Sequence, residues 1–153
     1  MKTALVNIKD VKSARLRTDA SYHLSEGQAV QRDIASSPYP LMKVRDVAND
    51  IFIGNRAKRS ADHGIPFLSS SDILKGDLEH VKLASKKYTS EIEKMLLHKG
   101  WTLISRSGTI GNCAFANAKH AQKLASEHVI RLVPNNILRG GLVYAYLASK
   151  YGH

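Results

Sequence analysis

The fold is decided by a segment in the second half of the chain, which reads Gly100-Trp101-Thr102-Leu103-Ile104-Ser105-Arg106-Ser107-Gly108-Thr109-Ile110-Gly111-Asn112-Cys113-Ala114-Phe115-Ala116. Apolar residues dominate residues 101–105 and 112–116, and both stretches have the length of a short strand. Between them, Gly108 and Gly111 can supply the positive φ angles that a tight turn requires. The segment therefore predicts a β-hairpin with Arg106 at its tip.

The hairpin is expected to belong to a larger sheet. A third strand over residues 128–133 is closed by Pro134 and is predicted to pair with the hairpin. Further strands are predicted at residues 4–8, 41–47, 51–54 and 65–69. The last of these is assigned to a sheet edge, because Pro66 has no N–H group to donate to a neighbouring strand.

Three helices are predicted between and after these strands. Ser25 with Gln28 three residues on forms a capping-box pattern that favours a helix over residues 24–35. Ser90 with Glu93 forms a second such pattern, for a helix that Gly100 ends. Residues 137–151 begin a C-terminal helix behind Asn135 or Asn136 as the cap. Together the elements predict a compact α+β domain with a mixed or antiparallel sheet and flanking helices.

Length and charge limit the classes of function. The 153 residues have room for one domain, and 43% apolar residues are enough for a core, which excludes a disordered basic tail. The net charge of +10 attracts polyanions, chiefly nucleic acids and membrane headgroups. No run approaches the roughly 18 to 20 apolar residues of a membrane span, and no basic amphipathic helix is evident. One cysteine, Cys113, excludes a disulfide scaffold, so we expect a cytoplasmic protein without a membrane partner.

Catalytic and metal-binding patterns are missing from the sequence. The seven histidines and the single cysteine lack the close spacing of metal ligands. Neither a phosphate-binding loop nor a dinucleotide fingerprint occurs, and the proline-rich signature of amino-methyltransferases is absent. We therefore expect no enzyme activity, no cofactor and no metal.

The segment over residues 100–111 resembles the signature of target recognition domains in the DNA specificity (S) subunits of type I restriction-modification systems. That family usually has a Gly-Asp pair, a strand, and then a Ser/Thr-Arg-Ser-Gly-Thr/Ser hairpin ending in glycine. Here Trp101 and Thr102 stand where the acid is usual. Other pieces resemble family segments in the expected order: residues 16–22, 44–54, 65–73 and 126–134.

The resemblance implies a protein that reads one half of a split double-stranded DNA sequence and catalyses nothing itself. Its partners would be the methyltransferase (M) and restriction (R) subunits of the same system. Complete specificity subunits carry two recognition domains separated by long helices. The 153 residues are therefore expected to form a single target recognition domain of a larger subunit.

Candidate DNA-binding residues follow from charge and geometry. Arg106, between small neighbours, can form a fork to guanine O6 and N7, whereas lysines suit phosphates. Serine hydroxyls can donate to or accept from base edges. The candidates in the predicted loop over residues 55–64 are Arg56, Lys58 and Arg59, and those elsewhere are Ser69, Ser70, Ser71, Lys86, Lys87, Arg106, Ser107 and Thr109.

Three alternatives stay open from the residues alone. The basic groups could simply solvate surface loops. A single-stranded nucleic-acid binder would stack bases on exposed aromatic side chains, although only 7% of the residues are aromatic. A basic protein-interaction module would not bind duplex DNA at any salt concentration.

Overall fold

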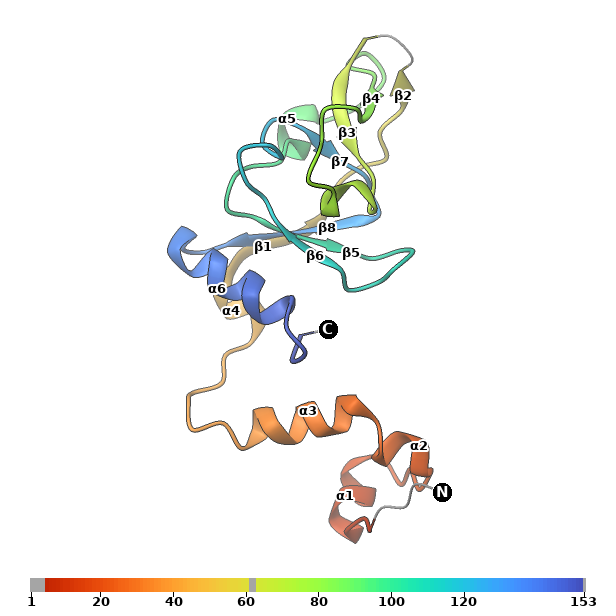
Figure 1. Cartoon of the computed structure of the whole chain (residues 1–153), viewed down its shortest axis with the longest axis vertical. Helices are drawn as coiled ribbons and strands as arrows, with labels where there is room; N and C mark the ends of the chain where they lie inside the picture. Colours follow the sequence, from red (N-terminus) through yellow and green to blue (C-terminus); the bar gives the residue numbers. More distant parts are fainter. Residues whose placement is uncertain (1–4, 61–62, 153) are drawn as a thin grey trace. The chain divides into compact units, whose positions relative to one another are not determined.

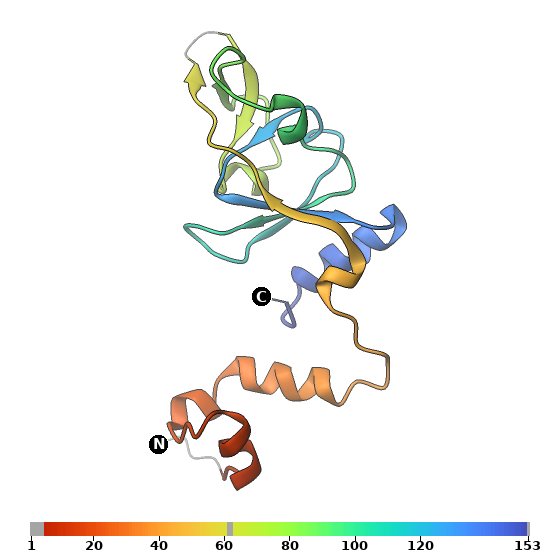
Figure 2. The same ribbon diagram turned by 180° about the vertical axis from the view of Figure 1, so that it is seen from behind.

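The computed structural model describes residues 5–60 and 63–152, which form two compact units that meet in sequence between Leu41 and Met42. Figures 1 and 2 show the chain from opposite sides. No helix in the described ranges is long and apolar enough to cross a membrane.

The first unit is helical. It contains α1 (Ile8–Ser13), α2 (Ala20–His23) and α3 (Glu26–Ala35). The predicted strand over residues 4–8 is wrong: the side chain of Asn7 accepts a hydrogen bond from the N–H of Lys9 at 2.9 Å and begins α1 instead, while residue 4 lies outside the described ranges. The predicted helix over residues 24–35 is confirmed, because the Ser25 hydroxyl accepts from the N–H of Gln28 at 3.3 Å.

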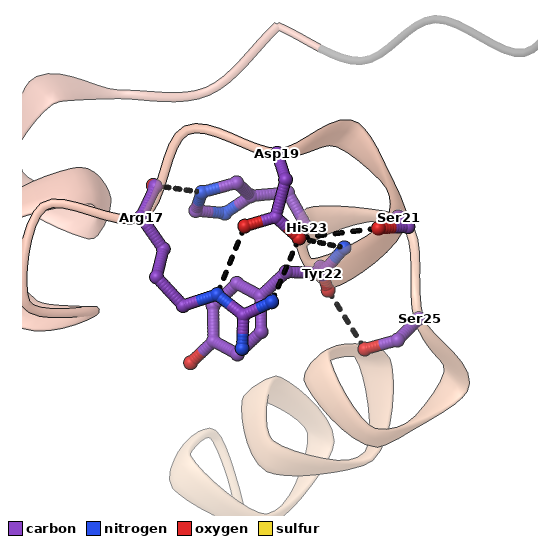
Figure 3. Close-up of polar contacts among 6 residues, drawn as sticks. All are labelled: Arg17, Asp19, Ser21, Tyr22, His23 and Ser25. Atoms are coloured by element: carbon purple, nitrogen blue, oxygen red, sulfur yellow. Dashed lines mark hydrogen bonds and ion pairs between the residues drawn. The ribbon is translucent and has the colours of Figure 1, made fainter.

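A polar network closes the turn before α2 (Figure 3). The Arg17 guanidinium donates from Nε and Nη2 to the two carboxylate oxygens of Asp19, at 2.9 and 2.8 Å. The same carboxylate accepts from the N–H of Tyr22 at 3.1 Å and so caps α2. Hydrogen bonding from Arg17 holds the pKa of Asp19 well below its ordinary value, at about 2. Local hydrogen bonds therefore shape this unit.

The first of two sheets in the second unit contains the predicted hairpin. Its strands are β1 (Ala48–Ile53), β5 (Thr102–Ser105), β6 (Cys113–Phe115) and β8 (Val129–Pro134), in the antiparallel order β1-β8-β5-β6. Thr102 lies between Leu132 of β8 and Phe115 of β6. The prediction that the hairpin and the strand over residues 128–133 share a sheet is confirmed.

The second sheet is mixed. It contains β2 (Arg59–Ser60), β3 (Ile65–Leu68), β4 (Lys82–Ala84) and β7 (Leu124–Ala125), in the order β2-β4-β3-β7 with β3 and β7 parallel. The predicted edge position of residues 65–69 is wrong, because β3 has neighbours on both sides. Pro66 is tolerated there since the ladder with β7 begins only at Phe67.

Short helices lie before and between the strands, namely α4 (Val44–Val47) before β1, and the 3-10 helix η1 (Asp72–Leu74) and α5 (Ile92–Met95) between later strands. The predicted strand over residues 41–47 is wrong, because the Asp46 side chain accepts from the N–H of Lys43 at 3.2 Å and starts α4. The helix predicted between Ser90 and Gly100 is present only as α5, and the predicted capping box is wrong, because no side chain caps this helix. Glu91 adopts a positive φ of 51°, and buried Leu97 leaves the helix to bond with Lys123 and Gln122.

The predicted C-terminal helix is present as α6 (Ile137–Leu147), which ends before the predicted bound at residue 151. It packs against β5, β6 and β8, on the face of the first sheet away from the second sheet (Figures 1 and 2). The core lies between the two sheets. Its buried members include Leu68, Leu97, Leu103, Ala125 and Val129. Apolar burial thus joins the sheets, and the observed fold is the predicted α+β class.

Candidate nucleic-acid interface

A buried arginine fixes the turn between β7 and β8. Arg131, in the middle of β8, is 0% exposed. Its guanidinium donates from Nη1 to the carbonyl oxygens of Val129 at 2.8 Å and Ser126 at 3.3 Å, and from Nη2 to that of Ala125. Burial lowers the pKa of Arg131 to about 10. Burying this guanidinium costs free energy, and its hydrogen bonds stabilise the backbone of residues 125–129.

Gly54 is the residue that leaves room for this guanidinium. A Cβ atom at position 54 would lie 2.6 Å from Nη2 of Arg131. The ring of Phe52 lies on the guanidinium as well, with its centroid 5.7 Å from Cζ. The end of β1 is therefore shaped to accept the buried cation.

Three predicted segments meet around residues 126–128, which we call the central turn. The N–H of Ser126 donates to the carbonyl of Leu68 at 2.9 Å, which places the end of β3 beside it. The N–H of Arg106 donates to the carbonyl of His128 at 3.0 Å. Nε of Arg56, whose side chain is 88% exposed, lies 3.7 Å from the Glu127 carboxylate. Arg56, Ser69 and Arg106 are thus gathered from distant parts of the sequence.

The serine segment after β3 is organised by Asp72. Its carboxylate accepts from the backbone N–H of Ser69 at 2.9 Å and from the Ser69 hydroxyl at 2.5 Å, and Lys75 donates to it at 2.6 Å. Burial alone would raise the pKa of Asp72, but the bonds from Lys75 and Ser69 outweigh it and hold the pKa at about 2. The Ser69 hydroxyl also lies 3.0 Å from that of exposed Ser71. The Ser71 hydroxyl is therefore part of the same network, and the Ser70 hydroxyl is the more available one.

The hairpin loop has the predicted backbone. Gly108 and Gly111 have φ angles of 76° and 89°. The Ser105 hydroxyl donates to the carbonyl of Ser107 at 2.9 Å, and the N–H of Gly111 donates to the carbonyl of Ser105 at 2.9 Å. The prediction that Arg106 occupies the tip is wrong, because its bond to His128 continues the β5–β8 ladder. Arg106 is exposed at the base of the loop, and exposed Thr109 lies farther out along it.

A second group of residues, which adds Lys82 to four predicted candidates, forms what we call the basic edge. The N–H of Ser85 donates to the carbonyl of Lys58 at 2.8 Å, and Arg59 pairs with Ala84 in the β2–β4 ladder. Arg59 is thus in a short strand rather than in the predicted loop. This pairing brings together exposed lysines and arginines from two segments: Lys58, Arg59, Lys82, Lys86 and Lys87.

Tyr88 stands between two of these lysines. Its side chain is 60% exposed, and the Nζ atoms of Lys58 and Lys87 lie 5.6 and 5.3 Å from its ring centroid. Such an arrangement holds two cations over one aromatic side chain. Sequence reasoning did not select Tyr88, although an aromatic residue beside a lysine pair was a usable signal.

Sequence reasoning also missed Glu127, His128 and Arg131. An arginine flanked by Val129, Ile130, Leu132 and Val133 was the available signal, because a charge inside an apolar strand needs a special partner.

Ser107 and Thr109 lie in the hairpin loop, outside the contacts that define the central turn and the basic edge. Within the described ranges, no three His, Cys, Asp or Glu side chains are grouped to hold a metal ion.

The fold is shared with two solved structures of restriction-modification proteins. The HsdS subunit from Thermoanaerobacter tengcongensis matches with a TM-score of 0.54 at 17% identity, over 92% of this chain and 36% of that one. A chain from a structure on complex assembly and conformational transition of the type I R-M system matches with a TM-score of 0.51 at 16% identity, again over 92% and 36%. The present chain therefore spans little more than a third of either protein.

The sequence carries the same relationship. The family model of the type I restriction modification DNA specificity domain matches residues 39–151. The chain belongs to this family, as the hairpin signature predicted. Among curated proteins, none is similar enough in sequence to count as a match.

Proposed function

We propose that this chain is a DNA target recognition domain that reads one part of a double-stranded target for a type I restriction-modification system. In this role it catalyses nothing and acts with the M and R subunits, in the cytoplasm where their DNA lies. The observation that carries the proposal is the meeting of Arg56, Ser69 and Arg106 around the central turn, beside a family signature for DNA specificity.

The two groups of residues have different proposed tasks. The flexible ammonium groups of Lys58, Lys86 and Lys87 on the basic edge neutralise phosphates and hold the duplex. The groups around the central turn sit on a braced backbone, so they read base edges. Arg106 is the residue proposed to form a fork to guanine.

The proposal is tested by titrating labelled duplex DNA with the protein at several salt concentrations. The affinity should be weak and should fall as salt rises, because each phosphate contact releases counterions. Lys86→Ala should reduce the slope of log affinity against log salt by about one. Lys150→Ala, at an exposed lysine after α6, should change the slope less. An affinity that does not depend on salt would contradict phosphate binding and favour a protein-interaction module.

Single-stranded nucleic-acid binding is a second candidate, favoured by exposed Tyr88 between two lysines. Aromatic rings stack bases that are not held in a duplex. Competition between duplex and single strands of the same sequence separates the candidates. If the single strand competes better and Tyr88→Ala removes that advantage, this second function replaces the first.

A further inference from the structure

The central turn carries an acidic residue in a surface otherwise suited to DNA. Glu127 is 30% exposed at its side chain, with Arg56 Nε at 3.7 Å and His128 Nε2 at 3.8 Å from its carboxylate. Both distances exceed the range of a hydrogen bond. Its charge also attracts the buried Arg131 guanidinium. Within the described ranges the carboxylate accepts no hydrogen bond, so its oxygens can still accept one from a ligand.

The backbone beneath Glu127 is fixed from inside the protein. Arg131 donates to the carbonyls of residues 125, 126 and 129, which flank position 127 on both sides. The Ser126 hydroxyl also accepts from the N–H of His128 at 3.3 Å. A side chain on a backbone held this way reaches a ligand with little loss of conformational freedom.

A carboxylate on a DNA-facing surface is repelled by phosphates, so it does not serve general affinity. Its favourable partner in duplex DNA is an amino group on a base edge. Cytosine presents its N4 amino group in the major groove, and Glu or Asp is the side-chain type that accepts from it. The neighbouring Arg56 offsets the repulsion between Glu127 and the phosphates.

We propose that Glu127 is a specificity-determining residue that accepts a hydrogen bond from the N4 amino group of a cytosine in the target duplex. This inference rests on the proposed function. It adds a residue that reads cytosine to Arg106, which is proposed to read guanine. The two backbones are linked, because Arg106 bonds to His128 next to Glu127.

The experiment selects binders from a pool of random duplexes at low salt with the wild-type chain, Glu127→Gln and Glu79→Gln, followed by sequencing. Glu79 is the matched control, because it is exposed and forms no ion pair in the described ranges. The wild type should enrich a motif that contains a cytosine. Glu127→Gln should lose about tenfold of the preference at that one position, with a shift towards adenine, because a glutamine amide suits adenine N6 and N7. Glu79→Gln should keep the whole motif.

Each other outcome decides a different point. An identical motif for Glu127→Gln and wild type overturns the role of Glu127 and leaves the proposed function in place. Salt-dependent binding without any base preference also overturns the role of Glu127, but it supports binding to phosphates. If the wild type binds no duplex at all, the proposed function fails, and the inference fails with it.

Discussion

At the scale of single residues, Arg131 shows how the fold uses a charged group whose burial costs free energy. Within the described ranges, Nε of the buried guanidinium has no hydrogen-bond partner, and the acidic group that acts on its charge is Glu127. Nη1 and Nη2 donate to the backbone carbonyls of Ala125, Ser126 and Val129, in and beside the central turn. The free-energy cost of burying the guanidinium is offset by these hydrogen bonds, which also satisfy carbonyls that would be costly to bury unpaired, and by attraction to the Glu127 carboxylate.

We expect Arg131→Ala to lower the free energy of unfolding by about 3 kcal/mol. The change removes charged hydrogen bonds and packing against Phe52, and leaves a cavity with unpaired carbonyls. Urea unfolding followed by circular dichroism measures the loss. Arg139→Ala, at an exposed arginine of α6, is the control. It should change the free energy of unfolding by less than about 0.5 kcal/mol, as surface substitutions usually do. A similar small effect for both variants would show that Arg131 does not brace the turn.

Asp72 makes stability depend on pH. Its pKa is about 2 in the folded chain, below the ordinary value near 4 of an unfolded chain. The unfolded state thus binds the proton first as pH falls, so the contribution of Asp72 is present above about pH 4 and is lost between about pH 4 and 2. Between pH 5 and 2, the wild type should lose on the order of 2 kcal/mol more than Asp72→Asn. Urea unfolding of both proteins at a series of pH values measures this difference. If the free energy of unfolding falls in parallel for the two proteins, the prediction is refuted.

At the scale of elements, the hairpin and α3 were predicted correctly from local patterns, whereas the equally local caps of α1 and α4 were missed. The hairpin depends on two glycines and two short apolar runs within one segment, and α3 begins at a capping residue three positions before its partner. The extended path of Leu97 depends instead on backbone bonds to Gln122 and Lys123. Such a partner, more than twenty residues away, overrides a local helix pattern, because pairing buries Leu97 completely.

The pairing of β3 with β4 depends on the glycine just before β3. A Cβ atom at position 64 would lie 2.2 Å from the carbonyl oxygen of Ala84, which is backbone and cannot rotate away. Gly64→Ala should therefore lower the midpoint of urea unfolding, at a cost of about 2 kcal/mol or more. Gly76→Ala is the matched control, since nothing lies within 4 Å of its Cβ position. Equal midpoints for the two variants would mean that the strands separate freely at this point.

At the scale of the whole molecule, the candidate interface is assembled from positions that are far apart in sequence. Composition and the hairpin signature selected Arg56, Ser69 and Arg106 one by one. Their meeting around residues 126–128 follows from parallel pairing of β3 with β7 and from the β5–β8 ladder, which no single segment encodes. Sequence could therefore name members of the site but not its centre, where Glu127 lies.

The two units differ in what stabilises them. The buried hydrophobic residues of the described chain all lie after residue 42, whereas the first unit buries only His23 and relies on local hydrogen bonds such as Arg17 to Asp19. Hydrophobic burial is the dominant favourable contribution to folding. The second unit therefore contains what a cooperative fold requires, and it also contains both the central turn and the basic edge.

A chain of residues 42–153 should consequently fold by itself. We expect its thermal unfolding midpoint to lie within a few degrees of that of the full chain, because it keeps the complete core between the two sheets. Its salt-dependent binding to duplex DNA should also persist, since the lysines and arginines of both residue groups remain. Calorimetry and the duplex titration measure the two properties on the same samples. If the shortened chain unfolds without cooperativity, the first unit contributes to the fold in a way that its own contacts do not explain; if it folds but no longer binds, residues 1–41 belong to the DNA-binding surface.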